Sequence, residues 1–190
     1  MARWEPNARE RLAASALDLF VERGYEGTTA AEIATRAGLG KSTFFRHFAD
    51  KREVLFSGQE LLNDAFATAI AACPPTASPL DLLHAALAAA ARAFTPERRD
   101  FVTKRQSVIE QNTELREREL LKRAAMTDAL TTALRARDVD PQLAALAAEI
   151  GSLAFRTAFA RWLDPANDRD YAELARDELT ALSKAAATLS

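Results

Sequence analysis

The chain has 190 residues, of which 48% are apolar and 27% charged, and its formal net charge is −2. This balance is typical of a folded globular chain and excludes a disordered one, and the length fits one large domain or two small ones. Alanine occurs 42 times, whereas valine occurs five times and isoleucine four times. Because alanine favours helices and β-branched residues favour strands, we predict an all-α fold of about nine helices.

Three features exclude other classes of protein. The single cysteine, Cys73, excludes an intrachain disulfide framework and a cysteine-based zinc site. The longest unbroken apolar run is Ala85–Ala91, which is far shorter than the roughly 18 residues that a membrane span needs. The first six residues hold no apolar secretory core. We therefore expect a cytoplasmic protein without a membrane partner, a metal site or a cofactor.

Three helices are predicted at the N-terminus, over residues 8–23, 30–37 and 41–48. Residues 38–40, Gly-Leu-Gly, form the turn between the second helix and the third. Thr29 and Asp50 each lie three residues before a glutamate, so each can cap the start of a helix. The expected inward-facing apolar residues are Leu12, Ala16, Leu17, Phe20, Ile33, Ala34, Ala37, Phe44 and Phe48.

Longer helices are predicted in the rest of the chain. One helix over residues 51–72 connects the N-terminal block to the later helices, and residues 73–78 form the clearest linker. Ser78, Thr95 and Asp140 each precede a proline, a pattern typical of an N-cap and the first helical position. The further helices are predicted over residues 79–94, 96–111, 114–137, 141–163 and 169–188.

The second and third helices, joined by a glycine turn, have the spacing of a helix-turn-helix. In such a unit the start of the second helix meets base edges in the major groove, and Lys41, Ser42 and Thr43 stand at that position. Residues 35–52 also carry five lysines and arginines against one aspartate, a charge of +4 that suits a phosphate backbone. The spacing alone also fits a simple corner between two helices with a solvated charged face.

Residues 9–55 resemble the DNA-binding domain of TetR/AcrR-family transcriptional regulators. The segments that match are Leu19-Phe20, Arg23-Gly24-Tyr25, Thr28-Thr29, Ile33-Ala34, Ala37-Gly38-Leu39 and the block from Thr43 to Phe48 followed by Lys51. The resemblance implies a helix-turn-helix DNA-binding domain over residues 1–52 and a ligand-binding and dimerisation domain over residues 53–190. It also implies a homodimer on a two-fold operator, repression of nearby genes and release by a small, largely apolar ligand.

The resemblance also implies which residues contact DNA. The predicted DNA-binding residues are Thr29, Lys41, Ser42, Thr43, Phe45, Arg46, His47 and Lys51. Two positions depart from the family pattern, because Gly40 replaces the usual serine or threonine and Phe45 the usual tyrosine. A hydroxyl is therefore missing at each position. Before the first helix, Arg3 lies in a short arm that either reaches the minor groove or has no fixed structure.

The helix predicted over residues 141–163 is apolar nearly all round, so it must be buried on more than one side. It is either the central helix of a monomer or part of a four-helix interface with the last helix and a second copy. The resemblance favours the dimer. The predicted interface residues are Leu146, Ile150, Leu153, Ala154, Leu174 and Leu182.

A ligand pocket is expected in the C-terminal part, because His84 and Arg105 fall on apolar helix faces. Each needs a polar partner, since an unpaired charge is costly in the interior. That partner is either an internal carboxylate such as Glu149 or the polar end of a largely apolar ligand. The candidate pocket residues are Phe66, His84, Phe101, Arg105, Phe155, Phe159 and Trp162.

An enzyme is not expected. The two histidines, His47 and His84, fall in different predicted blocks, and the sequence has no zincin, nucleophile-elbow or phosphate-loop motif. Cys73 adjoins two prolines and has no evident histidine partner.

Overall fold

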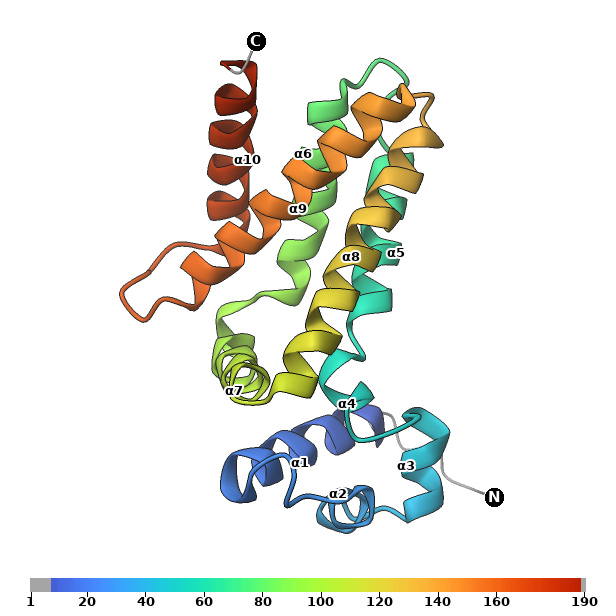
Figure 1. The fold of residues 1–190 in the computed structure, drawn as a ribbon, viewed down its shortest axis with the longest axis vertical. Coiled ribbons are helices and arrows are strands. Elements are labelled where there is room, and N and C mark those ends of the chain that lie inside the picture. The colour runs from blue at the N-terminus through green and yellow to red at the C-terminus, as the bar shows by residue number, and fades with distance from the viewer. Residues whose placement is uncertain (1–7, 189–190) are drawn as a thin grey trace. The chain divides into compact units, whose positions relative to one another are not determined.

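The computed structural model describes residues 8–188, which form an all-α fold without a strand, as predicted. The helices are α1 (Ala8–Arg23), α2 (Ala30–Arg36), α3 (Lys41–His47), α4 (Glu53–Phe56), α5 (Gln59–Ala71), α6 (Pro79–Ala90), η1 (Ala91–Ala93), η2 (Pro96–Arg98), α7 (Arg99–Glu110), α8 (Thr113–Arg135), α9 (Pro141–Leu163) and α10 (Tyr171–Ala187) (Figure 1). Within this range nine of the α-helices have seven or more residues, and α4 is a single turn. The predicted position of Arg3 lies outside the described residues.

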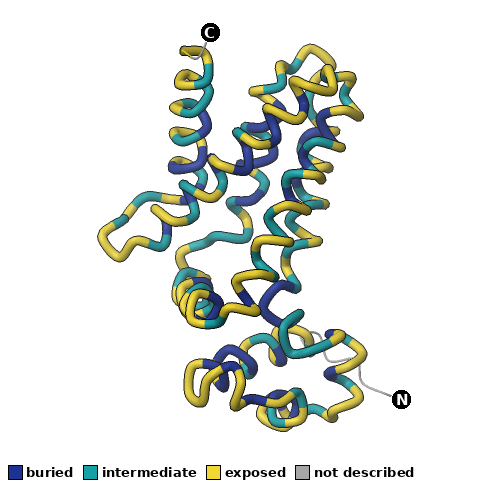
Figure 2. Tube along the Cα trace, viewed as in Figure 1, coloured by how far each residue is buried: buried dark blue, intermediate teal, exposed yellow. Residues whose placement is uncertain are grey.

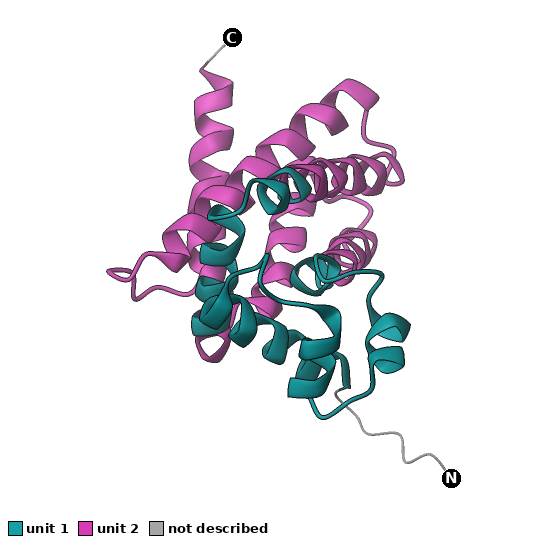
Figure 3. Cartoon of the chain, turned by 60° about the horizontal axis from the view of Figure 1, so that its bottom comes forward, with its two compact units in different colours: residues 1–58, 100–119 teal, residues 59–99, 120–190 magenta. Residues whose placement is uncertain are grey.

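The chain divides into two compact units (Figure 3). Unit 1 holds the residues up to Gly58 together with Asp100–Glu119, and unit 2 holds Gln59–Arg99 together with the residues from Leu120 onward. The domain boundary predicted at residue 52 therefore differs from this division, because α4, most of α7 and the start of α8 group with the N-terminal helices.

Unit 1 has one hydrophobic core, built by the residues that the helical spacing predicts. Leu12, Ile33 and Phe44 have no exposed surface, so α1, α2 and α3 each contribute a fully buried side chain. From the later segment of this unit, Ile109 and Leu115 join the same core. The segment 100–119 is therefore part of the unit that carries the first three helices.

The single helix predicted over residues 51–72 is wrong, because the chain leaves the helix after α4 and resumes it as α5. In an unbroken helix the carbonyl oxygens of Leu55 and Ser57 would accept backbone N–H groups four residues later. Here Nε of Arg105 donates to the Leu55 oxygen at 2.5 Å, and Nη2 of Arg9 donates to the Ser57 oxygen at 2.9 Å. The residue after Ser57 is a glycine, which favours the interruption.

Unit 2 is built around α9, which packs against α6 and α10, while α5 packs against α6. Asp140 caps α9, accepting the backbone N–H groups of Gln142 and Leu143 at 2.9 and 3.1 Å. Among the described residues, α9 is the one helix long and apolar enough to cross a membrane. Eight of its residues are buried against its neighbours, and buried and exposed positions alternate along it (Figure 2). It is the core helix of unit 2.

Two predicted helix boundaries differ from the structure. The helix expected over residues 79–94 begins at Pro79 behind its Ser78 cap, but its α-helical part ends at Ala90 and continues as the short 3₁₀ helix η1. The helix expected over residues 96–111 begins with the 3₁₀ helix η2 before α7. Phe94 lies between the two 3₁₀ helices with a non-helical backbone (φ −117°, ψ 62°).

Candidate nucleic-acid interface and ligand site

The turn between α2 and α3 fixes the helix-turn-helix. The predicted capping box starts α2, because the Thr29 hydroxyl accepts the backbone N–H of Glu32 and the Glu32 carboxylate accepts that of Thr29. At the other end, Gly38 has a φ of +67°, a left-handed conformation that favours glycine. The Gly40 cap position of α3 has no side-chain hydrogen bond, as expected from the missing hydroxyl.

One side of α3 is held in the core and the other faces outward. Phe44 is fully buried and Phe48 is 3% exposed, and their ring centroids lie 5.5 Å apart. The predicted DNA-binding residues of this helix lie on the other side, where Lys41, Ser42, Phe45 and Arg46 are exposed and Thr43 and His47 are half-buried. The two phenylalanines therefore fix which side chains α3 presents outside the unit.

Phe45 is the large apolar side chain on this outward surface, with 49% of it exposed. Its ring packs edge-on against Phe44 with the centroids 5.3 Å apart. Nζ of Lys41 lies 5.9 Å from the centroid of Phe45, within the range of a cation–π contact. Lys41 and Phe45 thus form a pair at one end of the exposed face of α3.

The basic residues of the segment 35–52 are less available to DNA than the net charge of this segment suggests. The guanidinium of Arg36 donates to both carboxylate oxygens of Glu22, at 3.0 and 2.7 Å. Arg52 is paired with two carboxylates of unit 1. Among residues 8–188, Lys41 and Arg46 are exposed cations that form no ion pair. These two exposed side chains carry positive charge that no described carboxylate compensates.

Lys51 also has partners inside unit 1. Its Nζ donates to the carbonyl oxygens of Tyr25 and Thr28 at 2.8 and 3.1 Å, and it lies 4.2 Å from the centroid of the Tyr25 ring. The ammonium group therefore holds the turn that leads to Thr29 and α2. One of its three N–H bonds remains for a phosphate at this position.

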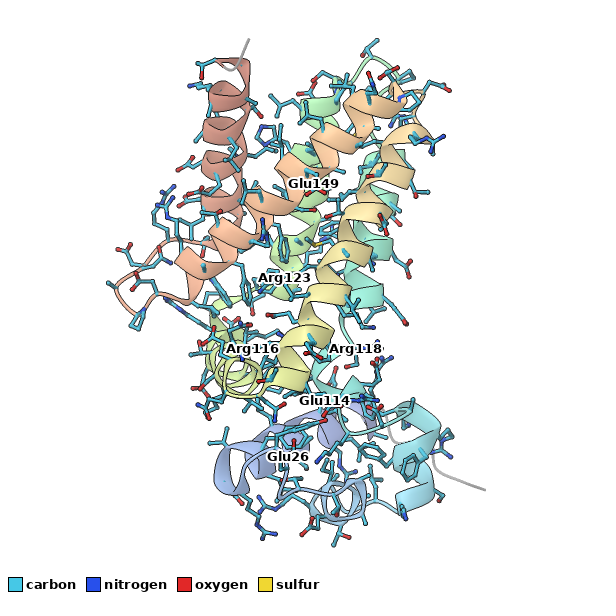
Figure 4. All side chains as sticks on the ribbon, in the orientation of Figure 1. Glu26, Glu114, Arg116, Arg118, Arg123 and Glu149 are labelled. Carbon is cyan, nitrogen blue, oxygen red and sulfur yellow. The ribbon has the colours of Figure 1, made fainter. Side chains whose placement is uncertain are left out.

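Charged side chains join the start of α8 to α4 within unit 1 (Figure 4). Arg52 contacts Glu114 at 2.6 Å, and Nε of Arg118 donates to Glu53 at 3.0 Å. Arg52 also contacts Asp50 at 2.6 Å. Burial alone would raise the pKa of the Asp50 carboxyl, but hydrogen bonds from Arg52 and from backbone N–H groups lower it.

Four of the predicted ligand-site residues come together in unit 2. Phe66 and Trp162 are buried and Phe155 and Phe159 are half-buried, and the rings of Phe155 and Phe159 stack with 5° between their planes. The structure adds two rings that the prediction missed. Together they form the aromatic cluster, which we define as Phe66, Phe94, Phe155, Phe159, Trp162 and Tyr171.

The two missed residues left a signal in the sequence. Phe94 was placed at the end of a predicted helix, and Tyr171 is at the start of α10 rather than on a stripe of aromatic residues. Only 7% of the chain is Phe, Trp or Tyr, and every such residue in the described part of unit 2 belongs to the cluster. The rarity of these residues, rather than their helical spacing, was the usable signal.

The remaining predicted pocket residues do not join the aromatic cluster. Phe101 and Arg105 belong to unit 1, where Phe101 packs on the core. Arg105 donates to the Leu55 carbonyl oxygen, and its guanidinium lies 5.2 Å from the centroid of the Phe56 ring. His84 lines an open groove between α6 and α10, beside Arg176 and Thr180.

The predicted dimer residues divide into two groups. Leu146 is 56% exposed and Leu153 38% exposed, with Ile150 half-buried between them on one stripe of α9. Leu182 of α10 is also half-buried. Ala154 and Leu174, in contrast, have no exposed surface, because they pack inside unit 2. Including these two in an interface between copies was wrong.

Comparison with known proteins agrees with this geometry. The family model described as bacterial regulatory proteins, tetR family, matches residues 12–57. The HTH-type transcriptional regulator TcmR of Streptomyces glaucescens is 38% identical over 81 residues, which are 43% of this chain and 36% of TcmR. The matched part thus spans about a third of that relative's length.

Solved structures match over nearly the whole chain. The TetR-family transcriptional regulator PfmR of Thermus thermophilus is 25% identical with a TM-score of 0.52, over 92% of this chain and 97% of PfmR. Thermus thermophilus FadR, a TetR-family repressor solved with lauroyl-CoA, is 22% identical with a TM-score of 0.55, over 92% and 93% of the two chains. The latter likeness concerns the fold.

The outward face of α3 and the all-helical fold are those of a helix-turn-helix protein. Residues 12–57 of the chain are similar to the tetR family of bacterial regulatory proteins, and the all-α fold matches that of the TetR-family regulator PfmR.

Proposed function

We propose that this protein is a repressor that binds a two-fold operator with the outward face of α3. The observation that carries this proposal is the division of α3 into a buried side, Phe44 and Phe48, and an exposed side with two unpaired cations. A short helix held in this way can present Ser42, Phe45 and Arg46 to base edges and phosphates. Thr29 caps α2, and Nζ of Lys51, which follows α3, lies beside this cap. Both side chains supply phosphate contacts there.

We propose that the protein acts as a homodimer through α9 and α10. The exposed leucines on one stripe of α9 support this proposal, because three large apolar side chains at spacings of three and seven residues share one face of the helix and are costly in water. They are Leu143, Leu146 and Leu153. A two-fold dimer presents two copies of α3, which must lie about 34–36 Å apart to meet successive major grooves.

A small, largely apolar effector is the proposed signal for release from DNA. The aromatic cluster supports this assignment, since it gathers six rings in unit 2 and leaves three of them half-exposed. The FadR relative was solved with lauroyl-CoA, so a protein of this fold binds a ligand that has an apolar acyl chain. The effector must favour a dimer geometry in which the two copies of α3 no longer match the operator.

A gel shift with the intergenic DNA of the protein's own locus tests the proposal. We expect a dimer-sized complex with wild type and loss of that complex with Lys41→Ala or Thr43→Ala, while the far-UV helix signal is unchanged. Lys104→Ala is the matched control, because Lys104 is an exposed cation of α7 paired with Asp100. Wild-type protein that binds no fragment of its own locus would overturn the proposal.

A further inference from the structure

Phe94 has an unusual place in the aromatic cluster. Its ring contacts those of Phe155, Phe159, Trp162 and Tyr171, with centroids 4.6 to 5.7 Å away. The other five rings of the cluster belong to α5, α9 or α10, whereas Phe94 lies in the irregular segment between η1 and η2. Short 3₁₀ helices have weaker hydrogen bonds than α-helices. Phe94 is therefore the central ring of the cluster and also the one held by the weakest local structure.

Tyr171 brings a polar atom into the cluster. It is 1% exposed, and its hydroxyl has no hydrogen-bond partner among the described residues. Leaving a buried hydroxyl without a hydrogen-bond partner destabilises the folded protein. Burial also raises the pKa of this phenol well above its ordinary value, so the group is a neutral hydrogen-bond donor. Its ring is also the nearest to Phe94, with the centroids 4.6 Å apart.

We propose that the effector binds in the place of the Phe94 ring, which occupies this effector position in the unliganded protein. The effector is a planar apolar ring that carries one hydrogen-bond acceptor for the Tyr171 hydroxyl. This inference rests on the proposed function and names the ligand class and the displaced residue. A ligand ring that replaces the Phe94 ring keeps the contacts with Phe155, Phe159 and Trp162. It also gives the Tyr171 hydroxyl a partner, which the phenylalanine ring cannot do. The bound ligand therefore makes the same ring contacts as the Phe94 ring and forms one additional hydrogen bond.

The chain connects this exchange to the DNA-binding unit. Five residues after Phe94 the chain enters α7, and from Asp100 onward this helix belongs to unit 1. Within unit 1, Arg105 of α7 donates to the Leu55 carbonyl oxygen at the end of α4. Displacing Phe94 moves a segment that is covalently joined to α7. The segment 94–99 is therefore the element through which the effector position reaches α4.

Two matched probes and three variants test the exchange. Acetophenone carries a ring and a carbonyl acceptor, and ethylbenzene carries a similar ring without one. Their affinities are measured by ligand-observed NMR titration against full-length wild type, Phe94→Ala, and Phe94→Ala combined with Tyr171→Phe. Phe94→Leu is the control variant, because leucine fills more of the space of the phenylalanine ring than alanine does and keeps the segment apolar. Far-UV circular dichroism checks that each variant is folded.

We expect Phe94→Ala to bind both probes at least about tenfold more tightly than wild type, since a ring-sized apolar space accepts benzene-like molecules. Phe94→Leu should show a smaller gain. In Phe94→Ala, which keeps Tyr171, the ratio of the acetophenone affinity to the ethylbenzene affinity should be at least about fivefold larger than in the double variant. A factor of this size corresponds to one hydrogen bond. Comparing this ratio between the two proteins cancels the difference in hydration free energy between the two probes.

Two results would overturn the inference. One is that Phe94→Ala, or Phe94→Leu if the alanine variant is unfolded, gains no affinity for either probe. The other is an affinity ratio that does not change when Tyr171 is replaced. Operator binding is measured separately on the unliganded proteins. Failure of wild type to bind DNA would count against the proposed repressor function, whereas failure of the probes would count against the ring exchange alone.

Discussion

The salt dependence of operator binding depends on which cations are unpaired at the interface. Five lysines and arginines lie in residues 35–52, but Arg36 and Arg52 are paired with carboxylates, and Lys51 donates to two carbonyl oxygens. Lys41 and Arg46 are left to meet phosphates, and Lys51 keeps one N–H bond for a third contact. A dimer therefore offers six such cations rather than ten.

The expected slope can be worked from that count. Each neutralised phosphate contributes about −0.9 to the slope of log affinity against log salt, so six contacts give about −5.4 and ten give about −9. Between 50 and 200 mM salt, the first slope lowers affinity by roughly 2 × 10³-fold and the second by roughly 3 × 10⁵-fold. The measured slope therefore distinguishes these two numbers of phosphate contacts.

The assay is fluorescence anisotropy of a labelled duplex from the protein's own locus, titrated at several salt concentrations. Lys41→Ala removes one contact from each copy, so we expect the slope to become shallower by about 1.8. Arg36→Gln is the matched control and should leave the slope unchanged, because Arg36 is held by Glu22. A wild-type slope near −9, or a shallower slope with Arg36→Gln, would refute the assignment of the unpaired cations.

Three further predictions concern assembly and stability. Leu146→Glu should raise the dimer dissociation constant at least about 100-fold in sedimentation, since a carboxylate in an apolar interface costs several kcal/mol. Gly38→Ala should cost about 1–2 kcal/mol in urea unfolding, because a side chain strains the left-handed backbone. Asp50→Ala should cost about 1 kcal/mol at pH 7, since the carboxylate caps Arg52 and Glu53. The lowered pKa of Asp50 makes its stabilisation present at neutral pH and lost as the pH falls below about 4, so the difference should shrink at pH 3.

Each of these predictions has a control and a contradicting result. Leu61→Glu changes an exposed leucine of α5 and should not affect assembly; equal effects of the two substitutions would remove the α9 stripe from the interface. Gly58→Ala adds a side chain with no atom within 4 Å and should be neutral or stabilising, and a loss as large as that of Gly38→Ala would contradict the backbone argument. A difference between Asp50→Ala and wild type that stays constant from pH 7 to pH 3 would show that the carboxylate charge is not involved.

Local patterns in the sequence determined most of the helices. The caps at Thr29, Ser78 and Asp140 act between residues two or three positions apart, so their partners are visible in the sequence. The burial of Phe44 and Phe48 likewise follows from their spacing of one helical turn. For this reason the outward face of α3 was also predictable, and with it the position of Lys41, Ser42 and Thr43 at the start of that helix.

Only the tertiary structure decided which charges are free and which rings meet. The interruption between α4 and α5 depends on Arg9 and Arg105, which lie about 50 residues away from the carbonyl oxygens they bind. The pairing of Arg36 with Glu22 and the meeting of Phe94 with Tyr171 also join residues from different helices or loops. Spacing along one helix fixes which side of that helix a residue occupies. It contains no information about the partner that a distant segment brings to that side, and this partner decides whether a cation is available to DNA or a ring to a ligand.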